Sequence, residues 1–280
     1  MLYGCCLFGS RDAARATEEG WIVIRVFPHI ENAKLMSLYH KGVEGQWSAA
    51  QLDWEHPLGL DRQAQQALGH VLTPVYLGEQ TAMVGASSVI PQFFAARQTE
   101  AQLYLATFLL DEARHFEILT QFYHKMNQRP LEVRDLKEIF RYQARLFKSQ
   151  DRIEWLWGIL LSDIFARHFY NTLKTLHPGS LFAHIASRIV RDEVRHLAFA
   201  ELFLGEVLQQ QPERAPSFLK MRDDLLGLMS AMSRGLKDQC ATIGLDGVLL
   251  IATVADDIEK KARRLHLHEP EAELEQDVAE

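Results

Sequence analysis

Two copies of one charged motif constrain this chain more than any other feature. The sequence DEARH fills residues 111–115, DEVRH fills residues 192–196, and apolar residues spaced three and four apart lead into each copy. Residues three apart share one face of a helix, so each copy presents a glutamate together with a histidine. Because the apolar stripe of a helix faces the core, both motifs are predicted to carry charge into the interior.

Buried charges of this kind need compensation. An isolated buried carboxylate would take up a proton or destabilise the fold, so the two motifs are expected to share metal ions. In helical bundles, a dinuclear carboxylate site takes Glu-x-x-His from each of two helices and one carboxylate from each of two others. The predicted ligands are therefore Glu112, His115, Glu193 and His196, and two further acids are required.

The remaining sequence is dominated by helical periodicity. Residues 21–27, WIVIRVF, are the one clear strand candidate, and Pro74 is expected to bend a helix or mark its start. Four of the predicted helices are much longer than average, which indicates an all-α bundle with four long core helices. The helices are expected near residues 32–42, 60–88, 98–126, 131–148, 151–176, 180–209, 215–240 and 244–265.

The two missing acids can be sought from the turns. Two ligands on adjacent antiparallel helices lie at the same height along the bundle when the turn between the helices falls near the midpoint of the sequence between the ligands. Asp163 and Glu193 place that midpoint at Pro178, within the helix-breaking sequence HPGS. Glu79 and Glu112 place it within PQFFAARQT, and Glu79 is the one acid between residues 63 and 98. Asp163 and Glu79 are therefore the predicted third and fourth acids.

Two alternatives to Asp163 stay open at this stage. Glu154 would place the turn inside a helical pattern and is interpreted as a surface or helix-end acid. His168 would lie at a suitable height along the bundle, but it is about 140° around the helix from Asp163. Only one of the two can therefore face the site. A surface ion pair between Asp163 and Arg167 is the non-functional interpretation.

Composition narrows the class of protein. The 280 residues are 48% hydrophobic and are expected to form one domain with a large core. Its parts would be an N-terminal arm (1–31), a dinuclear-metal bundle (60–210), accessory C-terminal helices (211–265) and an acidic tail (266–280). A net charge of −7 argues against a nucleic-acid partner, and the three cysteines lack disulfide or metal spacing. This cysteine pattern fits a reducing cytoplasm, and because no apolar run is long enough to span a membrane, we expect a soluble protein.

Together these residues resemble the ferritin-like dinuclear iron carboxylate superfamily, and more narrowly its oxygen-activating branch related to the ribonucleotide reductase small subunit. The resemblance covers roughly residues 32–210 and depends on Glu79, the two DE-x-RH motifs and the acid between them. It implies that Asp111 and Asp192 accept hydrogen bonds from the ligand histidines, and that Arg114 and Arg195 hold those aspartates.

Three departures separate the chain from particular relatives. Leu119 occupies the position of the radical-bearing tyrosine of the reductase, so a reductase role is not predicted. Thr81 stands where Mn/Fe ligand-binding oxidases have a crosslinked valine, and Ile189 stands where arylamine N-oxygenases have an extra histidine. The aspartate at the third acid is similar to the benzoyl-CoA epoxidase group but does not assign a substrate.

The predicted function is that of a non-haem dinuclear iron oxygenase or oxidase that uses O2 to oxidise a small, largely apolar substrate. The cofactor would be two Fe ions, with a Mn/Fe pair as the alternative, and an electron-donor protein and a homodimer are also expected. A Mn/Fe oxidase-like protein and a ferritin-like protein without substrate chemistry are the competing interpretations. The predicted pocket walls are Phe108, Phe116, Leu119, Phe165, Phe169 and Phe199.

Overall fold

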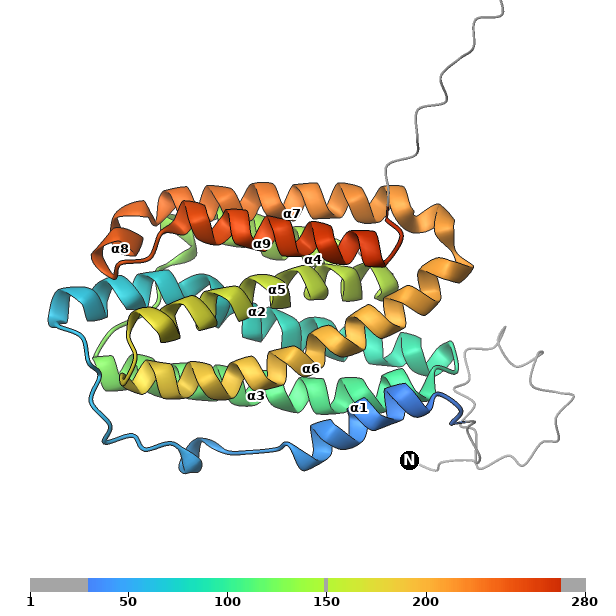
Figure 1. Ribbon diagram of the computed structural model, residues 1–280, viewed down its shortest axis with the longest axis horizontal. Helices are drawn as coiled ribbons and strands as arrows, with labels where there is room; N and C mark the ends of the chain where they lie inside the picture. Colours follow the sequence, from blue (N-terminus) through green and yellow to red (C-terminus); the bar gives the residue numbers. More distant parts are fainter. Residues whose placement is uncertain (1–29, 149–150, 268–280) are drawn as a thin grey trace, which may run out of the picture.

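The computed structural model describes residues 30–148 and 151–267, and these residues are almost entirely helical (Figure 1). No strand occurs among them, and the strand predicted at 21–27 and most of the acidic tail lie outside them. None of the helices in the described part of the chain is long and apolar enough to cross a membrane.

Four long helices form the centre of the molecule as two antiparallel hairpins. They are α2 (Arg62–Ala95) with α3 (Thr99–Met126), and α5 (Arg152–Leu176) with α6 (Leu181–Gln210). The turns fall at 96–98 and 177–180, where the midpoints of the predicted ligand pairs placed them. The two predicted ligands of each hairpin therefore lie at the same height along the bundle.

Local signals fix where these helices begin and end. Asp61 caps α2 by accepting a hydrogen bond from the Ala64 amide at 2.8 Å, and Ser180 caps α6 through the Ala183 amide at 3.1 Å. The α3 helix stops at Asn127, whose φ of 53° is the left-handed conformation that asparagine tolerates at a helix end. Each of these stop or start signals is visible in the sequence.

Three helix predictions need correction. The helix expected at 131–148 begins at Lys137, after a short 3-10 turn at Val133–Asp135. The α2 helix continues through both Pro74 and Pro91 to Ala95, although we expected it to end near residue 88. A proline inside a helix costs about 3 kcal/mol, but α2 is packed against α3 along its length and that burial outweighs the cost. The predicted helix at 215–240 is divided at Leu236 into α7 (Ala215–Gly235) and the short α8 (Lys237–Thr242).

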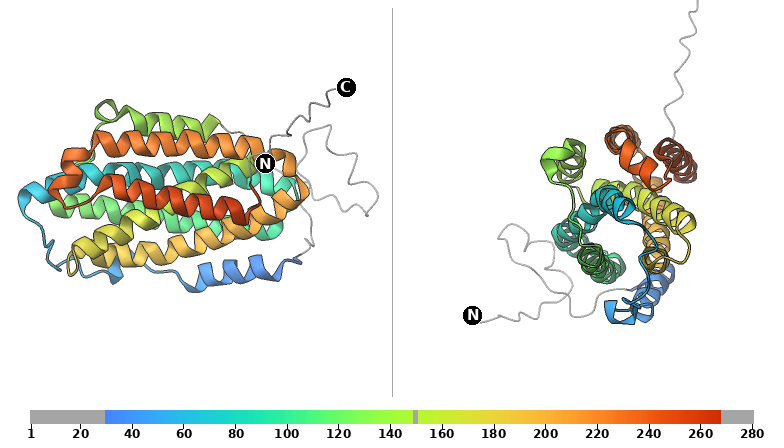
Figure 2. Two further views of the ribbon diagram at one scale, coloured as in Figure 1. Left: turned by 45° about the horizontal axis from the view of Figure 1, so that its top comes forward. Right: turned by 90° about the vertical axis from the view of Figure 1, so that its left-hand side faces the viewer.

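The other helices cover opposite sides of the four-helix centre. On one side, α1 (Ala33–Glu44) lies across α3 and α6 (Figure 1). Gly42 permits the close approach, since a Cβ there would lie 2.6 Å from Thr107 Oγ1. On the other side, α4 (Lys137–Lys148), α7 and α9 (Gly247–Arg264) cover α2 and α5, as the end-on view in Figure 2 shows.

Candidate metal centre

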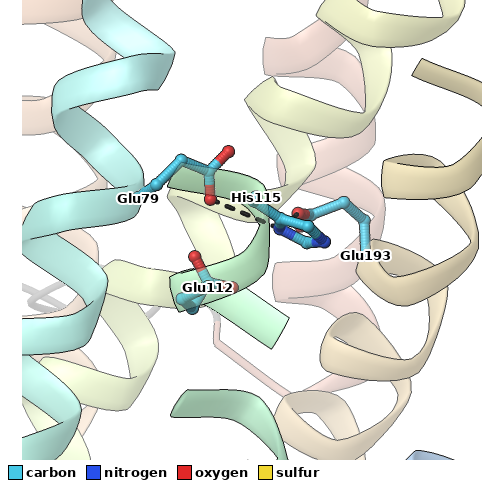
Figure 3. A group of neighbouring side chains, drawn as sticks. All are labelled: Glu79, Glu112, His115 and Glu193. Atoms are coloured by element: carbon cyan, nitrogen blue, oxygen red, sulfur yellow. Dashed lines mark ion pairs between the residues drawn. The ribbon is translucent and has the colours of Figure 1, made fainter. Parts of the chain in front are cut away.

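The four motif residues of α3 and α6 meet inside the bundle. Glu112 and His115 lie one turn apart on α3, Glu193 and His196 lie one turn apart on α6, and each is at most 3% exposed. Figure 3 shows Glu112, His115 and Glu193 pointing toward one another, with Glu79 of α2 beside them. The apolar stripe of each helix thus carries its charged motif into the interior.

Both histidines present Nδ1 to the carboxylates. His115 Nδ1 lies 3.4 Å from Glu79 Oε2 and 3.6 Å from Glu193 Oε1. His196 Nδ1 lies 3.2 Å from Glu112 Oε1 and 3.7 Å from Glu193 Oε2. Glu193 therefore reaches both histidines, one with each oxygen.

The six predicted residues form two overlapping donor groups. Glu79, Glu112, His115 and Glu193 offer ligand atoms that all lie within 4.8 Å of one another. Asp163, Glu193 and His196 form a second group within the same limit, and all the members of both groups are buried. Because Glu193 belongs to both, the arrangement has the geometry of two neighbouring cation positions with a shared carboxylate.

The two alternatives to Asp163 point elsewhere. His168 Nε2 lies 2.9 Å from Asp257 of α9, and Glu154 forms an ion pair of 3.3 Å with Arg145 of α4. Arg167 also contacts Asp257, at 2.5 Å. Asp163 is 7% exposed and is the α5 acid that the structure brings to the cluster.

The far nitrogen of each histidine is held by an aspartate from the opposite motif. His115 Nε2 lies 3.2 Å from Asp192 Oδ2, and His196 Nε2 lies 3.2 Å from Asp111 Oδ2. A carboxylate can only accept, so Nε2 carries the hydrogen and Nδ1 can present a lone pair to a cation. This crossed pairing ties α3 to α6 and fixes both ring orientations.

Two arginines complete this crossed network. Arg114 Nη2 donates to Asp111 Oδ1 at 2.6 Å and to Asp192 Oδ2 at 2.9 Å. Arg195 Nη2 donates to Asp111 Oδ2 and, at 3.2 Å, to Asp192 Oδ1. Each arginine thus bridges both aspartates. Although burial opposes it, hydrogen bonding to the histidines helps to hold the pKa of both aspartates well below its usual value.

Two further contributors come from the loop after α1, and no sequence pattern had indicated them. Gln46 donates to Asp111 Oδ1 at 3.0 Å and accepts from Arg114 Nη1 at 2.6 Å. Trp47 Nε1 donates to Asp192 Oδ2 at 2.8 Å. Neither residue belongs to a periodic pattern, and only the tertiary position of α1 brings them to the aspartates.

Glu79 has an additional partner that helical spacing did not assign. The hydroxyl of Tyr170 on α5 donates to Glu79 Oε1 at 2.9 Å, and Tyr170 is fully buried. This bond crosses from α5 to α2 and holds the carboxylate so that Oε2 faces His115.

Burial and repulsion between neighbouring carboxylates disfavour the ionised forms of two of the acids. Burial raises the pKa of Glu112 well above its usual value, and the neighbouring charges of Glu79 and Glu193 raise it further. Burial, followed by the charge of Glu193, also raises the pKa of Asp163. Four carboxylates in one interior site thus favour bound protons or other cations.

The pKa values of both histidines are raised, so their protonated, positively charged forms are favoured. Burial alone would lower the pKa of His115, but interactions with Asp192 and Glu79 outweigh it and raise that pKa to about 10. The pKa of His196 rises to about 9, because Asp111 and Glu193 likewise outweigh burial. In the protein without metal, protons on these rings stand where cations would otherwise balance the carboxylates.

Buried ligand atoms that lack a hydrogen bond test whether metal ions fit the site. Buried polar atoms are normally hydrogen-bonded, yet five ligand atoms of the cluster have no hydrogen bond among the described residues. They are Glu112 Oε1, Asp163 Oδ2, Glu193 Oε2, His115 Nδ1 and His196 Nδ1. Cations would satisfy all five, and a donor set of carboxylate oxygen and imidazole nitrogen without thiolate suits iron or manganese.

A pocket opens beside the acids, on the side away from α1. The space open to the centre of a water molecule is about 70 Å³, several times the 10–15 Å³ that one water needs. Glu79, Glu112, Asp163 and Glu193 border the pocket, whereas neither histidine does. Most of the remaining wall is apolar and includes Val75, Ala82, Ile139, Leu146, Ile159, Phe165, Met229 and Met232.

The predicted pocket walls need correction, since Phe165 alone of the six borders this pocket. Phe108 packs on His196 and Phe199 packs on Tyr104 in the core, whereas the partly buried Phe116 stacks on Tyr76. Leu119 is fully buried, and Phe169 borders a smaller neighbouring pocket. The pocket lies where α4 and α7 cover α2 and α5, whereas Phe108, Leu119 and Phe199 fill the core.

Comparisons with known proteins identify the fold. No protein-family model matches the chain, and no curated protein matches it significantly. A solved structure of R2-like ligand-binding oxidase with an aerobically reconstituted Mn/Fe cofactor (long soak) matches with a TM-score of 0.71 at 17% identity, over 92% of this chain and 98% of that one. Another, after photoconversion, has a TM-score of 0.70 at 18% identity, over 84% and 94% of the two chains.

The chain therefore has the fold of the R2-like ligand-binding oxidases. The predicted all-α bundle with four long core helices is confirmed. At 17–18% identity, this likeness is one of fold.

Proposed function

We propose that this protein is an O2-dependent dinuclear metal oxidoreductase that oxidises a small, largely apolar organic molecule. The observation that carries the proposal is the pair of overlapping, buried donor groups that border an apolar pocket. A purely structural buried network would be expected to hydrogen-bond its own polar atoms, whereas five ligand atoms here have no hydrogen bond.

Six residues would hold two metal ions. Glu79 and His115 would bind one ion, Asp163 and His196 the other, and Glu112 and Glu193 lie within reach of both positions. When bound, a pair of Fe ions, or one Mn and one Fe, supplies the redox chemistry by which O2 is reduced.

The protein side chains would set the conditions for that chemistry. The four carboxylates balance the charge of the ions, and the crossed aspartates keep each Nδ1 lone pair directed at the site. The apolar wall excludes water, and the pocket would hold an organic molecule beside the acids.

Electron counting defines what else the reaction needs. Insertion of one oxygen atom of O2 into a C–H bond, with the other atom leaving as water, consumes two electrons and two protons from an external donor. Removal of two electrons and two protons from the substrate, with O2 reduced to hydrogen peroxide, needs no such donor. The electron-donor protein, the homodimer and the cytoplasmic location expected from the sequence stay predictions.

Mn/Fe chemistry is the second candidate, favoured by the cofactor that the matching structures carry. Thr81 lies on the pocket wall two residues after Glu79, and its hydroxyl donates to the Leu77 carbonyl at 2.8 Å. A ferritin-like protein that only binds metal is the third candidate, but it would not need an apolar pocket beside the acids.

Anaerobic reconstitution tests the proposal. The metal-free protein would be loaded with Fe(II), or with Mn(II) and Fe(II), and its optical spectrum and dissolved O2 recorded after air is admitted. We expect O2 to be consumed together with an absorbance change. Metal binding without either signal would favour the metal-binding protein, and failure to bind metal would overturn the proposal.

A further inference from the structure

Four neutral polar side chains border the pocket in addition to the four acids. They are Thr81 of α2, Tyr142 and Gln143 of α4, and Ser162 of α5. Their hydrogen bonds decide which polar groups of a ligand the wall can satisfy, because a donor already in use cannot be offered again.

The two hydroxyls of Tyr142 and Ser162 have no free hydrogen. Ser162 Oγ donates to the Gly158 carbonyl at 2.9 Å, four residues earlier on α5. Tyr142 Oη lies 2.7 Å from Ser162 Oγ, and since the serine hydrogen is in use, the tyrosine is the donor of that bond. Only lone pairs remain available on these two oxygens.

The amide of Gln143 is oriented by its neighbours. Its Nε2 lies 2.8 Å from Thr81 Oγ1 and 3.3 Å from the Leu77 carbonyl oxygen. A carbonyl oxygen can only accept, so the NH2 group must face Leu77, and both of its hydrogens are in use. Thr81 in turn donates to Leu77. Gln143 Oε1 has no hydrogen bond to any described residue and is left as an acceptor.

The four neutral polar side chains of the pocket wall thus offer acceptors and no free donor. The residues that border it include no lysine, arginine or histidine among the described part of the chain. We infer that the substrate carries a hydrogen-bond donor, a hydroxyl or an amine N–H, which Gln143 Oε1 accepts. The inference deepens the proposed function and rests on it, since it concerns the molecule held beside the metal site.

Ring compounds of similar size provide matched probes. The pocket has room for a small molecule, so we would use phenol and aniline as donors and anisole as an ether without a donor. Binding would be measured by calorimetry without O2, on protein loaded with Mn(II), and the Mn content of each sample would be determined. The readout is therefore independent of turnover.

Gln143→Met is the decisive variant because it keeps the size of the side chain and removes the strong acceptor. We expect the wild-type protein to prefer phenol to anisole, and this preference to fall about fivefold in Gln143→Met. Gln143→Glu keeps an acceptor in the same place and should retain the preference, which gives a second test if the methionine variant does not fold. Gln121→Met, on α3 away from the pocket, is the matched control and should bind as wild type.

Two results would overturn the inference while leaving the proposed function in place. They are an equal phenol preference in wild-type and Gln143→Met protein, or no binding of any probe to Mn-loaded protein. Aniline and phenol, compared directly, distinguish an amine from an alcohol as the preferred donor. Absence of bound Mn would instead contradict the proposed function itself.

Discussion

The two sides of the metal cluster are built differently. On the α3 and α6 side, Asp111, Asp192 and the two arginines form a closed network that α1 and its loop cover. On the α2 and α5 side, Glu79 and Asp163 stand as single acids at the edge of an apolar pocket. The motif side has many partners per residue, and the pocket side has few.

The closed side positions the histidine rings, whereas the open side gives a small molecule access to the cluster. The closed side fixes the histidine rings and cannot admit a ligand, because its polar groups are already bonded to one another. The open side leaves Asp163 Oδ2 without a hydrogen bond and borders space for a small molecule. Substitutions on the two sides should therefore differ in kind, and the following experiments test that expectation.

Loss of the shared acid should have the largest effect. Glu193 belongs to both donor groups and Asp163 to one, so Glu193→Ala should lose both metal ions and Asp163→Ala should lose one. Activity should be abolished in both. Metal would be counted by elemental analysis after anaerobic reconstitution.

Glu154→Ala is the matched control on the same helix, since Glu154 pairs with Arg145 outside the cluster. It should retain the metal content of the wild type. If Asp163→Ala also kept that content, the assignment of Asp163 as a ligand would be wrong.

Breaking the closed side should reduce stability even without metal. Asp192→Ala would leave Arg114 without one of its aspartates and remove the acceptor of Trp47 Nε1. Removing one partner of a buried ion pair costs about 3–5 kcal/mol, and urea unfolding of the metal-free protein would measure this loss. Asp223→Ala, whose side chain is 64% exposed, should change the free energy of unfolding by less than about 0.5 kcal/mol. Equal losses of stability in Asp192→Ala and Asp223→Ala would contradict the proposed importance of the closed network.

The metal-free protein should lose stability as the pH rises from neutral. The pKa values of His115 and His196 are raised to about 10 and about 9, above the unfolded value of 6.5. The stabilisation from these protonated rings is therefore fully present below pH 6.5 and is lost as pH rises through 9 and 10. Each pKa unit corresponds to about 1.4 kcal/mol.

Urea unfolding between pH 6 and pH 10, with and without bound Mn(II), would test this pH dependence. Bound metal should displace the protons and flatten the profile. A metal-free profile that rises with pH would be the opposite of the expected sign.

Sequence patterns predict this molecule well where periodicity and turn signals act together. The turn midpoints favour Asp163 over Glu154, because antiparallel helices of equal rise bring ligands to one level, and Asp163 does lie in the cluster. Helix ends at Asn127 and at the caps Asp61 and Ser180 are equally local features.

The same patterns fail where tertiary packing decides. The positions of Gln46 and Trp47 depend on how α1 crosses α3 and α6, which no spacing within the loop encodes. The pocket walls depend on which faces α4 and α7 bury, and aromatic residues at helical spacing, such as Phe199, serve the core equally well. The predicted end of α2 near residue 88 was wrong because burial of the helix outweighed the local cost of Pro91.

Loss of the hydrogen bond from Tyr170 to Glu79 should have the smallest effect. Tyr170→Phe removes the donor to Glu79 Oε1 and should reduce the free energy of unfolding by about 1.5 kcal/mol, because that bond is made to a charged group. Metal should also bind more weakly at the position of His115. Tyr39→Phe on α1 is the control and should leave both quantities unchanged. A neutral result for Tyr170→Phe would show that the pocket side needs no support from α5.

Anomalous X-ray scattering from crystals of the reconstituted protein tests the central claim most directly. Data at the Fe and Mn absorption edges should show two metal peaks in the bundle, one bound by His115 Nδ1 and the other by His196 Nδ1, with Glu193 between them. A single peak, no peak, or coordination through Nε2 with the crossed aspartates displaced would contradict the account.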